Sequence, residues 1–462
     1  MVTTNRSARA ALVAVAALAA AALLLGACSE SEVSSGGAST TAPGAPGSVK
    51  PNAGDGTTVI SRFQGAEWFR GTVPAPNAAD TATAPIKVGF MNVDSGPIGA
   101  MPELHAATDA AVAFVNKELG GVDGRPVEVV PCLLSNPLSA DEAQACARQF
   151  VAADVLAVLG GIGLSNGAAL SVLEENGIPF VGGIPVNTPE MTSPVSFQFS
   201  GGSPGAFVAF AQDAVERQKA RKVAILYAEY PSIKEAAVGY GAGVARALGA
   251  QVTEVPFAMV SQDYVAPVQK AVESNPDAIF VGAADLACAP IMQAISDLRS
   301  TAKVYMVGSC ADVKQIDKVG VDKVVGFLFN VENRIDQTES SSADTEIYTL
   351  AMEKYAPGTT PRSAATVAFR GVMNLWSVLA DIGPQATRSQ VMEAFRAARD
   401  RASFDGHPYT CDGKQIPALP SLCSPQEIIA ELKGRSDFVE ASDGWIDVPA
   451  IVARTGVPTA TG

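Results

Sequence analysis

Short apolar runs alternate with amphipathic stretches through most of the chain after residue 85. The runs are apolar on both faces, which is typical of strands that helices cover on each side, and the stretches between them repeat apolar residues at helical spacing. A first series predicts strands at 86–92, 126–132, 155–161 and 178–183, with helices at 98–119, 138–152 and 165–176. This alternation predicts an α/β fold with a parallel sheet.

A second series of the same kind begins after residues 196–200. It predicts strands at 222–228, 251–257, 277–283, 303–309 and 323–330, with helices at 203–218, 232–248, 264–274 and 286–299. A wholly helical pattern then covers 342–398, and a Pro/Gly-rich tail closes the chain. Because each series is long enough to build one sheet with its helices, the sequence predicts two α/β lobes.

The N-terminus has the layout of a secretory signal. Two arginines precede an unbroken apolar run, 10–25, and the sequence LGAC (25–28) follows at its end. This ending resembles the bacterial lipobox, in which a peptidase cuts before the cysteine and the new N-terminal residue carries lipid. We therefore expect a signal peptide over 1–27 and lipidation of Cys28. An uncleaved membrane anchor, or an ordinary signal with a chance cysteine, is the alternative.

The segment between the signal and the first strand has the composition of a linker. Ser, Gly, Ala, Thr and Pro dominate it, and such a sequence cannot bury enough apolar surface to offset its ordering entropy. We expect a flexible stalk over 28–85. One interruption, 59–73, contains Phe63, Trp68 and Phe69 and is expected to pack loosely on the folded body.

Composition narrows the class of protein. The 462 residues are 48% hydrophobic and 17% charged, which excludes wholesale disorder, and the single long apolar run excludes a protein with several membrane spans. The formal net charge is −14, from 33 basic and 47 acidic side chains. This balance argues against a nucleic-acid partner, because neutralising phosphates requires a basic surface.

Seven cysteines are present, and six remain once Cys28 is assigned to the lipobox. An even number in an oxidising compartment indicates three disulfides. Six cysteines allow many pairings, among which proximity favours Cys132–Cys146, Cys288–Cys310 and Cys411–Cys423. A metal site is the weaker alternative, because no pair of cysteines has the close spacing of zinc ligands and the chain has only two histidines. We expect no metal and no cofactor.

Four loops that follow predicted strands contain candidate ligand-binding residues. In open α/β sheets, ligands lie beyond the carboxyl ends of the strands, where helix N-termini offer unpaired N–H groups. The loop NVDSGPIG (92–99) contains Ser95. In GGIGLSNG (160–167), the Ser165 hydroxyl and the free N–H groups could hold a ligand carboxylate without any chemistry.

Two further loops add apolar and amide groups. Pro185 and Asn187 lie in the Gly/Pro-rich loop 182–192, where the backbone can approach a ligand closely. Tyr230 follows the strand 222–228 and offers a flat apolar face with a polar tip. Each loop could instead have a purely structural role. The loop 92–99 could be a simple strand-to-helix turn, Asn187 could cap its own turn, and Tyr230 could only pack against its neighbours.

The loop 160–167 also contains G-x-S-x-G, the pattern of the hydrolase nucleophile elbow. A serine hydrolase would need His407 as base, with Asp381 or Asp400 as the acid between. No His-Gly-Gly-type oxyanion segment precedes Ser165, and His407 lies in the Cys/Pro/Gly-rich tail. The hydrolase therefore stays an alternative, and we expect a protein that is not an enzyme.

Together these segments resemble the type I periplasmic binding proteins, specifically the leucine/isoleucine/valine-binding family that delivers ligands to ABC transporters. The likeness covers residues 86 to about 400. No fragment is decisive alone, but their order and spacing are specific. The fragments are SGPIGAMPELHAATDAAVAFVNKELGGVDGRPVEVV (95–130), NPLSADEAQACARQFV (136–151), the GG-x-x-x-S loop followed by ENGIPFV, and NTPEMT (187–192).

The resemblance implies two doubly wound parallel-sheet lobes joined by a hinge of three crossovers. The first lobe would comprise 86–200 plus 331–400, and the second 201–330 plus 401–462. Ligand would bind between the lobes, and closure would create the surface that a permease recognises.

The resemblance also implies ligand contacts. The family's carboxylate contacts fall on Gly163 to Asn166 and on Pro185 and Asn187, a family Tyr of the second lobe falls on Tyr230, and the aromatic of the first loop falls on Met101. Asn187 departs from the Thr that amino-acid binders carry.

The family's partners for a ligand ammonium group are missing. Cys310 stands near the position of the family's Glu, and the family's Asp is absent from 201–203. A buried ammonium needs a carboxylate, so an α-amino acid is disfavoured unless Asp285, Asp312 or Asp94 substitutes. We expect a small polar or carboxylate-bearing metabolite, an amino acid or a relative of one, with Asp285 as a possible cation partner.

The expected function is that of an extracytoplasmic solute-binding lipoprotein of an ABC importer, held at the cell membrane by its lipid. Its expected partners are a small-molecule ligand and the permease subunits. Such a protein works by differential affinity, because a ligand with extra contacts in the closed state shifts the population toward it. A ligand sensor of the same fold that feeds a receptor instead of a permease is the alternative.

Overall fold

The computed structural model describes residues 59–60, 77–96, 98–331, 333, 343–359 and 364–457. The expected signal peptide, Cys28 and most of the expected stalk lie outside these residues, as do Phe63, Trp68 and Phe69. Val59 and Ile60 are buried in the core of the first lobe, and the Ile60 N–H donates to Glu118 Oε2 at 2.9 Å. This part of the aromatic interruption therefore packs on the body.

Ordered structure begins before the first strand. Asn77 forms a parallel bridge with Leu119, and its N–H donates to the Glu118 carbonyl oxygen at 2.9 Å. The Ala79 N–H donates to the Asn116 carbonyl oxygen at 2.7 Å. The last residues of the expected stalk are thus bound to the end of the first long helix, because their backbone finds partners there.

The first lobe contains a five-stranded parallel sheet with the order β2-β1-β3-β4-β5. Its strands are β1 (Ile86–Val93), β2 (Val127–Leu134), β3 (Ala157–Gly160), β4 (Phe180–Val181) and β5 (Ser196–Phe197). Every residue of β1 except Lys87 is buried. The apolar runs of the sequence are therefore strands that are covered on both faces.

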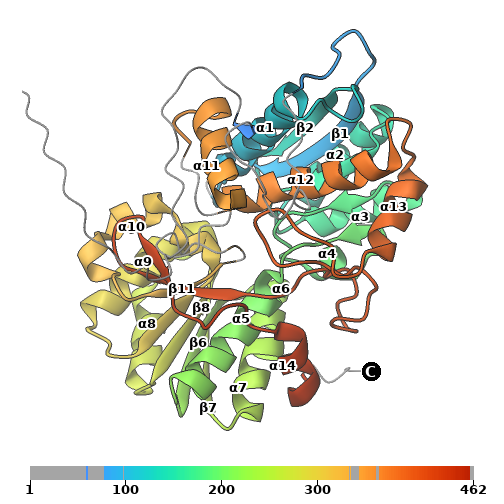
Figure 1. Cartoon of the computed structure of the whole chain (residues 1–462). Coiled ribbons are helices and arrows are strands. Elements are labelled where there is room, and N and C mark those ends of the chain that lie inside the picture. The colour runs from blue at the N-terminus through green and yellow to red at the C-terminus, as the bar shows by residue number, and fades with distance from the viewer. Residues whose placement is uncertain are drawn as a thin grey trace, which may run out of the picture. The chain divides into compact units, whose positions relative to one another are not determined.

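Helices from two distant parts of the sequence cover this sheet. They are α1 (Pro102–Glu118), α2 (Ala140–Ala152), α3 (Asn166–Glu175), α4 (Thr188–Thr192), α11 (Ala343–Tyr355), α12 (Ala365–Ile382) and α13 (Arg388–Ala397). Helix α1 packs against α11 and α12, whereas α2 packs against α3 (Figure 1). The helical pattern of 342–398 thus completes the first lobe.

The second lobe contains a seven-stranded sheet with the order β12-β11-β10-β9-β8-β6-β7. Its strands are β6 (Lys222–Ala228), β7 (Gln251–Phe257), β8 (Ala278–Gly282), β9 (Lys303–Met306), β10 (Leu328–Val331), β11 (Ile428–Leu432) and β12 (Phe438–Glu440). The strands are parallel except for the pairs β10–β11 and β11–β12. The tail thus adds two antiparallel strands that the sequence did not predict.

The helices of the second lobe lie on both sides of its sheet (Figure 1). They are α5 (Gly202–Gln212), α6 (Pro231–Lys234), α7 (Gly243–Ala247), α8 (Val265–Glu273), α9 (Asp285–Asp297), α10 (Val313–Val319) and α14 (Val448–Thr455). A π-helical segment, Glu235–Ala242, joins α6 to α7, so the single helix predicted at 232–248 is present as one continuous run. A second π-helical turn, Asp213–Arg217, extends α5.

Two connections between the lobes run side by side. The Gln198 N–H donates to the Ser421 carbonyl oxygen at 2.9 Å, and the Cys423 N–H donates to the Gln198 carbonyl oxygen at 2.7 Å. Phe404 and Tyr409 belong to the core of the first lobe. The chain therefore stays with that lobe beyond residue 400, where the second lobe was expected to begin, because these two rings complete an aromatic cluster there.

The three predicted disulfides are confirmed. Their Cα–Cα distances are 5.5 Å for Cys132–Cys146, 5.3 Å for Cys288–Cys310 and 4.4 Å for Cys411–Cys423. The first ties β2 to α2 and the second ties α9 to the turn after β9. Within the described ranges, no helix is both long enough and apolar enough to cross a membrane.

Candidate functional site

A cavity of about 280 Å³ lies between the carboxyl-end loops of the two sheets. The first lobe contributes residues that follow β1, β3 and β4, among them Met101, Gly163 and Ile184. The second lobe contributes the start of α5 and residues that follow β8 and β9. The cavity therefore occupies the place where open α/β sheets bind ligands.

The lining of the cavity is mostly apolar. The larger apolar side chains include those of Ile98, Ile162, Leu164, Phe207, Ile233 and Phe438. Asp285 is the one charged side chain among the described lining residues. The cavity therefore offers mostly apolar surface to a ligand, with a small number of polar groups.

Three of the nine predicted contact residues line the cavity: Met101, Gly163 and Asp285. Asp285 begins α9, and its Oδ1 accepts a hydrogen bond of 2.5 Å from Gln315 Nε2. Burial raises the pKa of Asp285, against the hydrogen bond from Gln315 and the positive charge of Lys318. The carboxylate expected as a cation partner thus already has a neutral donor.

Ser165 lies at the N-terminus of α3, directly after the lining residues Gly163 and Leu164. Its side chain is buried, and its Oγ has no hydrogen-bond partner among the described residues. Ser165 itself is not in the cavity lining. A buried hydroxyl without a partner is unusual in a folded protein.

The side chains of Asn166 and Asn187 hydrogen-bond within the protein and stabilise its fold. Both side chains bond the buried carboxylate of Glu190: Asn166 Nδ2 lies 3.0 Å from Oε1, and Asn187 Nδ2 lies 2.7 Å from Oε2. The Asn187 Oδ1 accepts from the Glu190 N–H at 3.3 Å, which completes a capping box at the start of α4. Pro185 and these two asparagines do not line the cavity. The capping alternative thus describes Asn187.

Burial raises the pKa of Glu190 to about 8. Its Oε2 also accepts from the backbone N–H of Val186 at 2.9 Å and of Asn187 at 3.2 Å, and these donors favour the charged form. The desolvation of a fully enclosed carboxyl group is the larger effect. Glu190 is therefore a structural centre that fixes the loop between β4 and α4.

The remaining two predicted residues lie outside the cavity lining. Ser95 is exposed. Tyr230 belongs to the second lobe, and its hydroxyl donates to the carbonyl oxygen of Leu164 in the first lobe at 3.1 Å. Because the Leu164 side chain lines the cavity, Tyr230 bridges the lobes and positions a wall residue instead of forming the wall.

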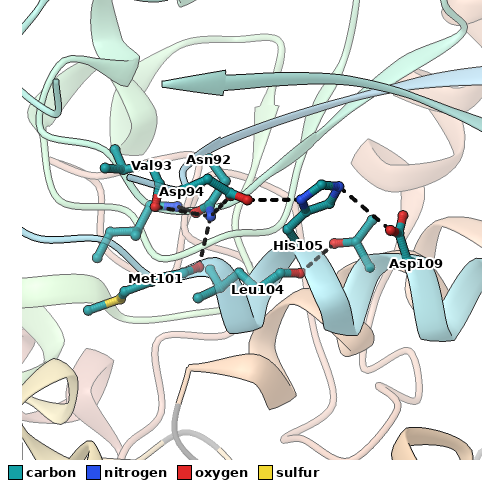
Figure 2. Close-up of polar contacts among 9 residues, drawn as sticks. Asn92, Val93, Asp94, Met101, Leu104, His105 and Asp109 are labelled. Carbon is teal, nitrogen blue, oxygen red and sulfur yellow. Dashed lines mark hydrogen bonds and ion pairs between the residues drawn. The ribbon is translucent and has the colours of Figure 1, made fainter. Parts of the chain in front are cut away.

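Sequence reasoning missed a polar network that holds two cavity loops together (Figure 2). The fully buried Asn92 donates through Nδ2 to the Met101 carbonyl oxygen at 2.8 Å and to Asp94 Oδ1 at 2.7 Å. Its Oδ1 accepts from the Ile162 N–H at 3.1 Å. The available signal was a polar residue inside an otherwise apolar strand, which is costly unless it is hydrogen-bonded.

His105 extends the network along α1, as Figure 2 shows. Its Nδ1 lies 2.9 Å from Asp94 Oδ2, and its Nε2 lies 3.6 Å from Asp109 Oδ2. The ring stacks on Phe90 with a centroid separation of 5.6 Å. Burial raises the pKa of Asp109. The network therefore anchors the loop 93–101 to the first turns of α1.

We expect Asn92→Ala to weaken ligand binding as well as folding. The change removes the partner of the Ile162 N–H and one of the two donors to the Met101 carbonyl oxygen, which keeps the Leu104 N–H. We expect a cost of about 1–3 kcal/mol in the free energy of unfolding and a looser attachment of both cavity loops. Urea unfolding and ligand titration of the variant would measure the two effects.

Asn116→Ala is the matched control. The Asn116 side chain also donates to a backbone carbonyl oxygen and accepts from a backbone N–H, both of Val127, and Asn116 does not line the cavity. It should lower stability and leave affinity unchanged. Equal losses of affinity in the two variants would contradict the role assigned to Asn92.

The hydrolase triad is not assembled. His407 Nδ1 lies 2.7 Å from the Pro408 carbonyl oxygen, and its ring lies against Trp445 at 5.4 Å. Asp381 pairs with Arg401 at 2.7 Å. Since Ser165 Oγ is bonded to no residue in the described part of the chain, the geometry gives no support to the serine hydrolase alternative.

Comparison with solved structures finds the same fold repeatedly. A leucine-binding protein from Thermotoga maritima is 20% identical, with 77% of this chain and 97% of that chain covered and a TM-score of 0.64. A fatty acid ABC transporter substrate-binding protein from Thermomonospora curvata is 16% identical, with 81% and 96% covered and a TM-score of 0.68. Both likenesses show the fold.

A third structure, a solute-binding protein of an ABC transporter from R. palustris in complex with 4-hydroxybenzoate, is 19% identical, with 79% and 97% covered and a TM-score of 0.66. No curated protein matches the chain. The family model described as periplasmic binding protein matches residues 85–416, which is more than half of the sequence. The cavity between two α/β lobes and this match lead to one conclusion: the chain belongs to the periplasmic binding protein family, whose members are extracytoplasmic solute-binding proteins.

Proposed function

We propose that this protein is the lipid-anchored substrate-binding component of an ABC importer and that its ligand is an acid with an apolar body and one carboxylate. The apolar lining of the cavity is the observation that carries the ligand class. Burying an apolar ligand surface there is favourable by about 25 cal/mol per Å². A strongly polar solute would lose its hydration without gaining enough partners.

We assign binding of the ligand's carboxylate to the Ser165 loop, residues 160–167. Ser165 Oγ is buried without a partner among the described residues, and the first N–H groups of α3 lie at the same turn. N-terminal N–H groups and a hydroxyl can hold an anion without a cationic side chain. This assignment agrees with the absence of Lys, Arg and His from the described cavity lining.

Two structural neighbours support an apolar acid as the ligand. The Thermomonospora curvata protein is described as a fatty acid substrate-binding protein, and the R. palustris protein was solved in complex with 4-hydroxybenzoate. Both names refer to acids with an apolar body. The Thermotoga maritima protein is described as leucine-binding, so an amino acid is the competing ligand class.

The proposals of an ABC importer and of a lipid anchor rest on other observations. Two of the three neighbours are described as ABC transporter proteins, and the sequence at 25–28 has the lipobox pattern. Three disulfides agree with an oxidising compartment outside the cytoplasm. A lipid on Cys28 would keep an acidic protein beside its permease.

A thermal-shift screen tests the ligand class. Protein freed of bound ligand would be melted with octanoate, phenylacetate, leucine and glutamate, because a ligand that binds only the folded state raises the midpoint by mass action. We expect octanoate and phenylacetate to give the larger shifts. A shift with leucine or glutamate and none with the two apolar acids would contradict the proposal.

A further inference from the structure

One wall of the cavity is formed by helices instead of by loops at strand ends. Thr345, Tyr348 and Thr349 come from α11, and Thr366 comes from the start of α12. Helix α11 packs on α1, which follows β1, whereas Ser165 follows β3. Figure 1 shows α11 and α3 on opposite sides of the first lobe. This wall is therefore separate from the Ser165 loop.

The threonine hydroxyls of this wall are satisfied within the chain. Thr345 Oγ1 bonds Asp405 Oδ1 at 2.7 Å, Thr349 Oγ1 bonds the Thr345 carbonyl oxygen at 2.9 Å, and Thr366 Oγ1 bonds Asn333 Oδ1 at 3.4 Å. Tyr348 is the exception. Its side chain is 2% exposed, and its hydroxyl has no hydrogen-bond partner in the described part of the chain. A tyrosine that lines a cavity with an unmet hydroxyl is poised to receive a partner from a ligand.

The charges near Tyr348 define the kind of partner. Burial raises the pKa of Tyr348 well above its usual range, and the negative charges of Asp405 and Glu103 add to the effect, so the hydroxyl stays neutral. Glu103 Oε2 is itself buried without a partner among the described residues. A second carboxylate on the ligand would be desolvated here without a cationic partner among the described lining residues, whereas a neutral hydroxyl could accept a hydrogen bond from Tyr348.

We propose that Tyr348 hydrogen-bonds a neutral hydroxyl on the apolar part of the ligand, so that the cavity prefers an apolar hydroxy acid to the same acid without the hydroxyl. This inference rests on the proposed function, because the ligand's carboxylate is assigned to the Ser165 loop. A site that is built to bond a hydroxyl discriminates against the analogue that lacks it, since the protein group is then left unpaired.

Calorimetric titration with two matched pairs of probes tests the inference: 4-hydroxyphenylacetate with phenylacetate, and 8-hydroxyoctanoate with octanoate. We expect the wild type to bind the hydroxy member of at least one pair about 10-fold more tightly. Tyr348→Phe should abolish this preference. Tyr264→Phe is the matched control, because the Tyr264 hydroxyl bonds the Met259 carbonyl oxygen at 3.0 Å and Tyr264 lies outside the cavity lining, and it should keep the preference.

Thermal unfolding without ligand gives an independent readout. Since the Tyr348 hydroxyl bonds nothing in the described chain, Tyr348→Phe should leave the midpoint unchanged or raise it. A drop of several degrees would show a structural role and overturn the inference. Binding of the acids without any preference for the hydroxy members would overturn it and leave the proposed function intact. Failure of all four acids to bind would contradict both.

Discussion

Replacing Ala100 with tryptophan should abolish ligand binding while the protein stays folded. Ala100 is half-buried and lines the cavity, next to the wall residues Gly99 and Met101. An indole at this position would fill a large share of the 280 Å³ that the ligand needs. The side chain can extend into existing space, so the core is not overpacked.

The expected loss of affinity is at least about 100-fold. At a ligand concentration of about 100 times the wild-type Kd, the ligand-induced stabilisation should therefore fall from about 2.7 to about 0.4 kcal/mol. Titration of the variant with octanoate and phenylacetate would measure it, alongside the thermal midpoint without ligand. Ala106→Trp is the matched control, since Ala106 is also half-buried but lies on α1 outside the cavity lining. Unchanged affinity in Ala100→Trp would show that ligand binds elsewhere.

The fold was predictable because its strands are covered on both faces. Runs such as 86–92 and 222–228 are apolar at nearly every position, and only a sheet between two helical layers buries both faces. The strands β11 and β12 were missed because they lie in a tail rich in Pro and Gly. The boundary at residue 400 could not be read either, since the burial of Phe404 and Tyr409 depends on rings from distant helices.

The candidate site was predictable only in part. Met101 and Gly163 were predicted from the resemblance to the periplasmic binding proteins, and Asp285 as a substitute for the acidic partner that this family carries. All three line the cavity, which agrees with the rule that ligands lie beyond the carboxyl ends of parallel strands. The wall that contains Tyr348 does not follow from it, because α11 reaches the cavity by packing on α1. Asn187 was readable as a cap, since an Asn followed three residues later by Glu190 is a capping-box pattern.

Glu190 should make the folded protein less stable as the pH rises from about 5 to about 9. Burial raises the pKa of Glu190 from 4.5 to about 8, so the folded state keeps a proton that the unfolded state loses above about pH 4.5. The contribution of Glu190 to stability is therefore fully present below that pH and is lost as the pH rises through about 8. Each pKa unit corresponds to about 1.4 kcal/mol, so the loss amounts to several kcal/mol.

Two other buried carboxyl groups act in the same direction. Burial raises the pKa of Asp405 and of Glu103 to about 7 each, so their contributions are also present at low pH and lost toward pH 7 and above. The wild type should therefore lose stability over a broad range. A variant that removes one of these carboxyl groups should reduce the dependence of the free energy of unfolding on pH only in part.

Glu190→Gln isolates the contribution of Glu190. Glutamine can keep one oxygen as acceptor for the Val186 and Asn187 N–H groups, and its amide NH₂ then faces Asn166. The Asn166 Oδ1 is buried without a partner among the described residues. If the Asn166 amide rotates by half a turn, its Oδ1 can accept a hydrogen bond from the new glutamine NH₂. We expect the variant to match the wild type near pH 5 and to exceed its stability near pH 9.

Urea unfolding at several pH values between about 5 and 9 would measure the difference. The control is Glu175→Gln, because Glu175 is exposed on α3 and its replacement should leave the pH profile of the wild type unchanged. Parallel profiles for the wild type and Glu190→Gln would mean that Glu190 is ionised in the folded protein. In that case the four donors around its carboxylate, and not its desolvation, would decide its charge, and the loop between β4 and α4 would hold a fixed anion beside the ligand cavity.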